Sequence, residues 1–201
     1  SRSLARSSRA ACFASMRSWY SSRRWAVVRR ELNQSAQRRM VVLRPLKLTL
    51  TNWPTDEAGQ PVVEHFEVAN NPERPEDGTR QVAFTGQLVI EADDFAEVPP
   101  PKFFRLSPGR EVRLRGAYLV TATDVVKDDQ GNVVEVLATY DPATRGGDAP
   151  DGRKVKSTMH WVSRPHSVRV SAALYDRLFT AAVPGDATGE ALDDLNPNSR
   201  E

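Results

Sequence analysis

The amino-acid sequence predicts an all-β protein with two β-barrel units. Apolar and polar side chains alternate in many short runs, which is the pattern of strands with one buried face. Turn-forming residues recur between these runs, and segments with helical periodicity are few. The prolines at residues 98–102 cannot donate hydrogen bonds to a strand ladder, so they indicate an extended connection between the two units.

The N-terminal segment is set apart by its composition. Residues 1–30 contain eight arginines and no lysine or acidic side chain, and residues 1–24 hold eight serines. A disordered tail, a mitochondrial transit peptide and a basic nucleic-acid-binding arm all fit this composition. The rest of the chain holds 20 basic and 26 acidic side chains, so the basic isoelectric point arises from this segment. The body is therefore not a generally basic nucleic-acid binder.

The first strands are predicted just after a short helical pattern at residues 25–40. Leu46, Leu48 and Leu50 alternate with polar residues and predict a strand, and Pro45 places it at a sheet edge or at a strand start. The run PVVEHFEVAN predicts the next strand. The intervening TDEAGQ is typical of a turn, which predicts a hairpin between these two strands.

Two later regions also alternate. After the proline-rich loop at residues 70–79, the run RQVAFTGQLVIEADDF predicts a third strand. At residues 110–140 two β-rich runs flank Asp-Asp-Gln-Gly-Asn, where Gly131 suits a positive φ. This is the strongest local signal in the chain, and it predicts a hairpin.

The segment 141–166 is rich in Gly, Pro and Asp before it reaches a basic cluster and a His-Trp pair. Three interpretations are open: a catalytic loop, a phosphate cradle or a structural hairpin. Within it the run RKVKSTMHWVS predicts a strand. Residues 170–179 fit either a short helix or an irregular packing segment, and the sequence from Pro184 onward is typical of a loop.

Catalytic and metal-binding signatures are missing from the sequence. His160 and His166 lie six residues apart with no acidic or thiol ligand close by, so structural roles are favoured over metal binding. Cys12, the single cysteine, excludes an internal disulfide framework. No nucleophile elbow, Walker loop or dinucleotide-binding glycine pattern occurs. No apolar run of about 18 residues indicates a membrane span.

A cluster of arginines carries the remaining functional signal. These arginines could be solvated or paired with acids on a strand face. Alternatively they could bind RNA, since arginine and aromatic side chains bind splayed bases and phosphates, and β-barrels are common platforms for this. The cluster follows the aromatic pair Phe103–Phe104 and comprises Arg105, Arg110, Arg113 and Arg115.

Several long motifs, in the same order along the chain, resemble the C-terminal anticodon-binding region of glutaminyl-tRNA synthetase, a class I aminoacyl-tRNA synthetase. The resemblance covers about residues 28–199, and the segment through His160-Trp161-Val162-Ser163 is similar to the glutaminyl rather than the glutamyl branch. The motifs are ELNQSAQRRMVVLRPLKLTLTNWP, NNPERPEDGTRQVAF, PGREVRLRGAY, VVKDDQGNVVEVLATYDPATRGGDAPDGRKVKSTMHWVS and LYDRLF.

The resemblance implies a fold, a tRNA partner and the separation of tRNA binding from catalysis. In the family a proximal and a distal β-barrel bind the anticodon, and a separate Rossmann domain joins glutamine to its tRNA with ATP and magnesium. The matched motifs belong to the barrels alone. We therefore expect tRNA(Gln) recognition without catalysis by this chain alone, no cofactor of its own, no metal, no membrane partner, a monomeric state and a cytoplasmic location.

The resemblance also implies site residues. Arginine suits an anticodon contact because its planar fork binds a base edge or a phosphate with two hydrogen bonds and can stack. Lys102 stands where some members carry glutamine, and Glu73 where some carry asparagine. The anticodon-binding residues implied are Arg38, Lys102, Arg105 and Arg115. Contacts to the tRNA backbone are implied for Arg113, Arg153, Lys154 and Lys156. His160 and Trp161 are expected to be structural, with Trp161 a core anchor in a long hairpin.

The expected organisation follows from the same comparison of motifs. The expected segments are a Ser/Arg-rich segment at 1–26, a helical lead-in at 27–39, part of the proximal barrel at 40–98, part of the distal barrel at 99–170, and a truncated return segment toward the proximal barrel at 171–201.

The Ser/Arg-rich segment departs from the family, which has an acid-containing amphipathic helix there. We therefore expect residues 1–26 to be a non-native stretch, such as the out-of-frame translation of a frameshifted gene. A standalone RNA-binding module with a basic arm and an inert product of a broken gene are the alternative functions.

Overall fold

The computed structural model describes residues 26–200. Residues 26–35 are helical, and residues 1–25 of the expected non-native segment lie outside the described residues. Nine strands follow in the described part: β1 Pro45–Leu50, β2 Glu64–Ala69, β3 Thr79–Phe84, β4 Gln87–Glu91, β5 Glu111–Leu114, β6 Leu119–Lys127, β7 Val133–Asp141, β8 Thr158–Met159 and β9 Val162–Ser163. Short 3-10 helices lie at η1 Pro75–Asp77, η2 Ala92–Asp94, η3 Pro142–Thr144, η4 Arg164–His166 and η5 Ala191–Asp194.

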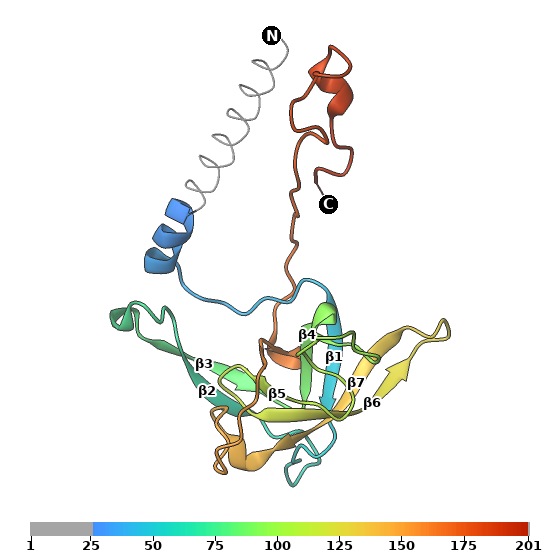
Figure 1. Ribbon diagram of the computed structural model, residues 1–201. Coiled ribbons are helices and arrows are strands. Elements are labelled where there is room, and N and C mark those ends of the chain that lie inside the picture. Colours follow the sequence, from blue (N-terminus) through green and yellow to red (C-terminus); the bar gives the residue numbers. More distant parts are fainter. Residues whose placement is uncertain (1–25, 201) are drawn as a thin grey trace. The chain divides into compact units, whose positions relative to one another are not determined.

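One curled sheet organises the fold and confirms the all-β prediction. Seven strands are hydrogen bonded in the order β8-β5-β6-β7-β1-β4-β9, and β2 and β3 form a separate ribbon. The two end strands are separated in the chain by only His160 and Trp161. Three peptide steps span at most about 11 Å, so both ends of the sheet must lie close together. The sheet therefore curls into a half barrel (Figure 1).

The predicted hairpin at residues 110–140 is confirmed. Strands β6 and β7 pair in antiparallel fashion along their length, with register shifts near Ala122 and Val126. The Asp128 carboxylate accepts hydrogen bonds from the backbone N–H groups of Gln130 (3.0 Å) and Asn132 (2.8 Å). Gly131 closes the turn with a φ of 84°. The loop is therefore built by an aspartate side chain and a glycine, as its sequence indicates.

The predicted hairpin between β1 and β2 is wrong. Strand β1 pairs with β4 on one edge and runs parallel to β7 on the other, whereas β2 pairs with β3. Strand β1 lies between β7 and β4 in the sheet, so both of its hydrogen-bonding edges are occupied and neither is left for β2. The TDEAGQ loop is closed by its own Thr55–Pro61 bridge instead.

The predicted third strand is in fact two. β3 ends at Phe84 and β4 begins at Gln87, because the chain turns at Gly86. A Cβ atom on Gly86 would lie 2.6 Å from the Cβ of Trp53, so only glycine allows this close approach. The Gly86 carbonyl accepts a hydrogen bond from the Leu50 N–H at 2.8 Å, which carries the chain from the ribbon into the sheet.

The expected segments 40–98 and 99–170 share the same sheet. Strands β1 and β4 come from the first segment, and β5 to β9 come from the second. Because β1 lies between β7 and β4, the two segments bury their apolar faces in one common core. The proline-rich stretch near residues 98–102 is a loop within the first compact unit, which ends at His166.

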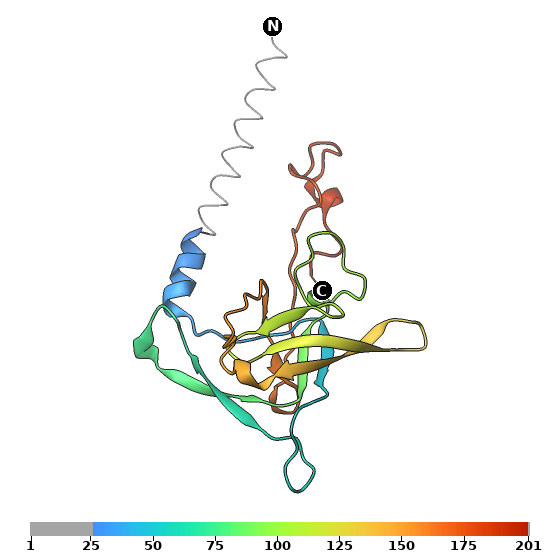
Figure 2. The same cartoon turned by 60° about the horizontal axis from the view of Figure 1, so that its bottom comes forward.

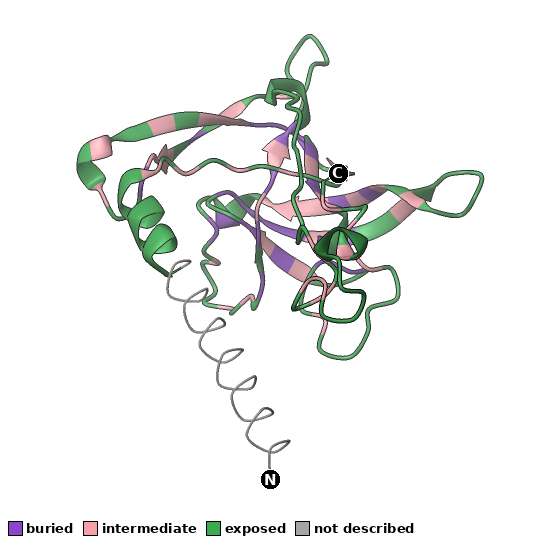
Figure 3. Cartoon of the chain, turned by 90° about the horizontal axis from the view of Figure 1, so that it is seen from above, coloured by how far each residue is buried: buried purple, intermediate pink, exposed green. Residues whose placement is uncertain are grey.

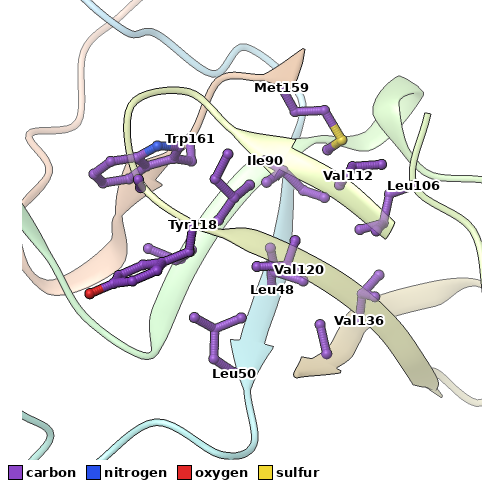
Figure 4. Packing of buried hydrophobic residues seen from close by; sticks show 14 of the residues in the cluster. Leu48, Leu50, Ile90, Leu106, Val112, Tyr118, Val120, Val136, Met159 and Trp161 are labelled. Atoms are coloured by element: carbon purple, nitrogen blue, oxygen red, sulfur yellow. The ribbon is translucent and has the colours of Figure 1, made fainter. Parts of the chain in front are cut away.

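The core lies inside the curled sheet. Leu48, Ile90, Val120 and Val136 have almost no exposed surface and converge from four neighbouring strands (Figure 4). Figure 3 shows that buried residues concentrate in these strands, whereas the loops and the 26–35 helix are exposed. Such buried aliphatic side chains supply most of the stabilisation of a sheet fold.

An aromatic cluster closes one end of the core. Trp161 is completely buried, its ring centroid lies 4.7 Å from that of Phe84, and its indole Nε1 donates to the Arg115 carbonyl at 3.1 Å. The expected role of Trp161 as a core anchor is therefore confirmed. His160 is half-buried, and its Nε2 has no hydrogen-bond partner in the described part of the chain.

The β2–β3 ribbon projects from the sheet and is fastened at both of its ends (Figure 2). Near the sheet, the Tyr118 hydroxyl donates to Glu64 at 2.8 Å, and burial raises the pKa of Tyr118. At the far tip, the buried Asn71 donates to the carbonyls of Asn33 and Gln34, the last turn of the helix. These bonds satisfy carbonyl groups that a helix end leaves open.

Residues 167–200 form the second unit. Bridges join Tyr175 to Arg200 and Phe179 to Leu195, and residues 170–179 are irregular rather than helical. Several apolar side chains of this unit, including Leu178 and Leu192, are exposed. Within residues 26–200 no helix is both long and apolar enough to span a membrane.

Candidate nucleic-acid interface

A groove runs beside strand β5. Its volume is about 310 Å³, and its walls come from the 98–110 loop, the start of β5 and the chain just before β8. Phe104 contributes the exposed aromatic wall, with 51% of its surface accessible. The residues lining the groove are Phe104, Arg110, Glu111, Lys154, Val155, Lys156 and Ser157. We call this set the basic groove.

The wall opposite Phe104 is held by strand pairing. The Arg113 N–H donates to the Ser157 carbonyl at 2.9 Å, and the Arg115 N–H donates to the Met159 carbonyl at 2.8 Å. Residues 157–159 therefore run parallel to β5. The predicted hairpin over 141–166 is wrong, because β8 pairs with β5 and β9 pairs with β4, not with β7. The segment is a crossover that brings its lysines to the basic groove.

Lys154 and Lys156 both line the basic groove, as two of the expected backbone contacts. Both are exposed, and neither makes an ion pair in the described part of the chain. The Lys156 Nζ lies 5.4 Å from the centroid of the Phe104 ring, within cation–π range. The groove thus combines an aromatic face with two lysines that make no ion pair within residues 26–200, and Glu111 is its one acidic lining residue.

The loop that carries Phe104 also contains Lys102. Lys102 is exposed, with a φ of 66° that L-residues rarely adopt, and the Phe103 N–H donates to the Pro100 carbonyl. The Arg110 guanidinium donates to the Phe103 carbonyl. Fully buried Leu106 anchors the loop in the core. The loop therefore has a defined conformation at the edge of the groove.

Arg105 makes an ion pair beside this loop. Its Nη1 lies 2.7 Å from the Asp94 carboxylate, and the Asp94 side chain is only 10% exposed, against 48% for Arg105. Burial raises the pKa of Asp94, and the Arg105 guanidinium opposes that rise. The exposed part of the Arg105 guanidinium is oriented by this contact and faces solvent.

Arg113 and Arg115 occupy different environments. Arg115 is exposed directly after β5 and makes no ion pair in residues 26–200. Arg113 is half-buried against Gly147, with its Nη2 3.5 Å from the Asp148 carboxylate and its Nε buried without a hydrogen-bond partner. Arg115 is thus the more accessible of the two for a ligand.

Arg153 is enclosed by carboxylates. Its guanidinium donates to Glu111 with both Nε and Nη2 at 3.0 Å, to Asp141 at 2.5 Å and to Asp151 at 2.7 Å. These bonds raise the pKa of Arg153 and hold the pKa of Asp141 below its usual range. Glu111, Asp141 and Asp151 therefore occupy the guanidinium N–H groups of Arg153 that a phosphate would need.

Arg38 lies away from the basic groove, at the junction of the helix and the β2–β3 tip. Its N–H donates to the Asn70 carbonyl at 2.7 Å, and its Nη2 donates to Asn33 Oδ1 at 3.0 Å. Nearby, burial lowers the pKa of Arg80, and the charge of Arg39 lowers it further. The structure therefore brings Lys154 and Lys156 together at the basic groove but places Arg38 elsewhere.

Sequence reasoning missed two features of this interface. The first is the exposed position of Phe104 beside lysines that come about 50 residues later in the chain. The second is the Asp94 partner of Arg105. The Phe-Phe pair was a signal for the first, whereas nothing local indicates the second. Among residues 26–200 no group of three or more His, Cys, Asp or Glu side chains could hold a metal ion.

Family comparison defines the class of this fold and interface. The family model for the anti-codon binding domain of class I tRNA synthetases (E and Q) matches residues 36–141, and a second model of the same description matches residues 158–201. The chain belongs to this family of anticodon-binding domains.

The curated relatives narrow the class to one enzyme. The chain is 56% identical over 174 residues to the glutamine–tRNA ligase of Nitrobacter hamburgensis and 53% identical to that of Bradyrhizobium diazoefficiens. It is 45% identical to the glutamine–tRNA ligase of Clostridioides difficile. Each match covers 87% of this chain and 30% of the relative. The chain thus spans about a third of these enzymes and corresponds to their anticodon-binding part.

Proposed function

We propose that this chain binds the anticodon arm of tRNA(Gln) through the basic groove and the neighbouring Lys102, Arg105 and Arg115. The observation that carries the proposal is an exposed aromatic ring in a groove with two lysines that make no ion pair within residues 26–200. Phe104 supplies the ring, and Lys156 lies over it.

Acids pair with several arginines on other surfaces of the first unit. Arg44, Arg74 and Arg145 each form an ion pair with a nearby acid. In contrast, no ion pair within residues 26–200 involves a groove lysine, although the body of the chain has more acids than bases. Positive charge left free in an acidic body favours a polyanionic ligand.

The chemistry of the groove fits an unstacked RNA loop. A base can stack on the open face of Phe104, while Lys154 and Lys156 contact the phosphates that flank it. Arg105 can offer a planar fork to a base edge or a phosphate because Asp94 occupies only part of its guanidinium. The anticodon loop supplies such unstacked bases.

For the complete protein we propose a glutamine–tRNA ligase, in which this chain carries tRNA recognition. ATP and magnesium would act in the catalytic part of such an enzyme and not in the groove described here. A monomeric state, a cytoplasmic location and the roles of Arg38 and Arg115 in anticodon reading also stay predictions.

Binding measurements test the proposal directly. The affinity of the 201-residue chain for the anticodon stem-loop of tRNA(Gln) is measured over a series of salt concentrations. Replacing both groove lysines (Lys154→Gln with Lys156→Gln) removes two phosphate contacts. The slope of log affinity against log salt should therefore fall by about 1.5.

The matched control is Lys47→Gln, which removes an exposed lysine of β1 that does not line the groove. Its slope should equal that of the wild type. Equal slopes for the control and the double variant would contradict the proposal. Equal wild-type affinity for stem-loops of unrelated anticodon sequence would instead support a general RNA-binding module.

A further inference from the structure

The sequence resemblance assigns Arg153 to the tRNA backbone, but its surroundings indicate a different role. We propose that Arg153 is a positioning residue: it fixes the crossover 142–157 on the sheet, and it thereby sets Lys154 and Lys156 at the basic groove without contacting RNA itself. This inference rests on the proposed function of the groove.

The first support is the number and placement of its partners. Glu111 begins β5, Asp141 ends β7, and Asp151 lies in the crossover itself. Strands β5 and β7 are not neighbours, since β6 lies between them. Their backbones are therefore about 9–10 Å apart, and the Arg153 side chain spans this distance beside the first residues of β6.

The second support is the position of Arg153 in the chain. It immediately precedes Lys154 and lies three residues before Lys156, and Glu111 lines the same groove. An arginine held at both nitrogens by one carboxylate has a defined orientation, because the two parallel bonds fix its plane. The backbone next to Arg153 is fixed with the guanidinium, and so are the Cα positions from which the side chains of Lys154 and Lys156 extend.

The third support is the scarcity of other fastenings between η3 and β8. The Gly146 N–H donates to the Ala117 carbonyl, and Gly152 N–H bonds within the crossover to Ala149. At the two ends of the stretch, Asp148 lies 3.5 Å from the Arg113 guanidinium, and the Ser157 carbonyl accepts a hydrogen bond from the Arg113 N–H. Between residues 149 and 156 the described hydrogen bonds to the sheet are those of Arg153. The position of Lys154, in the middle of this stretch, therefore depends most directly on the partners of Arg153.

The test uses a substitution that preserves charge. Arg153→Lys keeps one positive charge beside the carboxylates but cannot reproduce the bidentate fork. The matched control is Arg44→Lys, which alters an exposed ion pair with Asp93 on another part of the sheet. Both variants are made in the full chain, alone and combined with Lys154→Gln and Lys156→Gln.

Two measurements are made on each variant: hydrogen exchange of the Gly152 and Arg153 amides, and affinity for the anticodon stem-loop of tRNA(Gln). Arg153→Lys should accelerate exchange and weaken binding on the order of tenfold, as expected for loss of one or two charge-assisted phosphate contacts. In the background that carries Lys154→Gln and Lys156→Gln, Arg153→Lys should have no further effect on binding. Arg44→Lys should change neither quantity.

Two results would overturn the inference. Wild-type exchange and wild-type affinity in Arg153→Lys would show that the fork fixes nothing. Equal losses of affinity in both backgrounds would show that Arg153 contacts the RNA itself. Failure of the proposed function has a different signature: the wild-type chain would not bind the stem-loop, and the exchange rates alone would then decide whether Arg153 fixes the crossover.

Discussion

Replacing Phe104 with alanine should weaken RNA binding strongly while lowering stability only slightly. The side chain forms one wall of the basic groove and leaves 51% of the residue surface accessible. Its open face is the proposed stacking platform for an anticodon base. The substitution removes that face and leaves the neighbouring lysines in place.

The expected magnitudes separate the two effects. Stacking of a base on an aromatic side chain contributes about 1–3 kcal/mol by alanine substitution, so the Kd should rise by about fivefold to 150-fold. Full burial of a phenylalanine contributes about 1.5–3 kcal/mol to folding, and Phe104 is half-buried. The free energy of unfolding should therefore fall by only about 1 kcal/mol, with a further loss of about 0.5 kcal/mol from the Lys156 cation–π contact.

The assay is fluorescence anisotropy of a labelled tRNA(Gln) anticodon stem-loop, with urea unfolding of each variant measured in parallel. Because phenylalanine is uncharged, Phe104→Ala should leave the salt dependence of binding unchanged. Val98→Ala is the matched control: it truncates an apolar side chain of the same loop that is 86% exposed and does not line the groove.

A folded Phe104→Ala protein with the affinity of Val98→Ala would refute the stacking role. A lower salt slope in Phe104→Ala would also contradict the reasoning, since it would mean that the substitution displaces the lysines.

Two further predictions concern stability. Gly86→Ala should lower the free energy of unfolding by about 1–3 kcal/mol in urea denaturation, because the new Cβ would meet Trp53 at 2.6 Å, and an unchanged midpoint would disprove this contact. The pKa of Asp141 is held below its usual 3.8, chiefly by the hydrogen bond from Arg153. The ionised Asp141 carboxylate therefore adds to the free energy of unfolding above about pH 5. This contribution is lost as the pH falls through the pKa of Asp141 in the folded protein. Asp141→Asn should be less stable than wild type at pH 7 and should lose less stability on acidification to pH 3, as thermal denaturation at each pH would show.

The two matched family regions lie on either side of the crossover. The first matched family region ends at residue 141 and the second begins at residue 158. The crossover that carries Arg153 and both groove lysines lies between these two regions. The groove thus combines residues from the first matched region with residues that lie between the two matched regions.

Local chemistry was enough to predict several features. The alternation of Leu46, Leu48 and Leu50 predicts one buried strand face, because side chains of a strand point to opposite sides. The Asp128–Asn132 loop predicts a hairpin, because its bonds all form within five residues. The long motifs predicted the anticodon-binding class, which the family comparison shows. These features depend on residues that are near neighbours in the chain.

The tertiary structure alone decided strand order and the state of each charge. Strand β1 pairs with β7, about 88 residues later at the Leu48–Val136 contact, and no local pattern encodes that choice. Arg153 and Lys154 are adjacent basic residues in the sequence. Folding surrounds Arg153 with three carboxylates from separate segments and leaves Lys154 exposed at the groove. The sequence by itself determined which residues could bind RNA, whereas the packing of distant segments decided how far each cation is free to do so. Carboxylates bind every nitrogen of the Arg153 guanidinium, whereas Asp94 occupies only part of the Arg105 guanidinium and Lys154 makes no ion pair within residues 26–200.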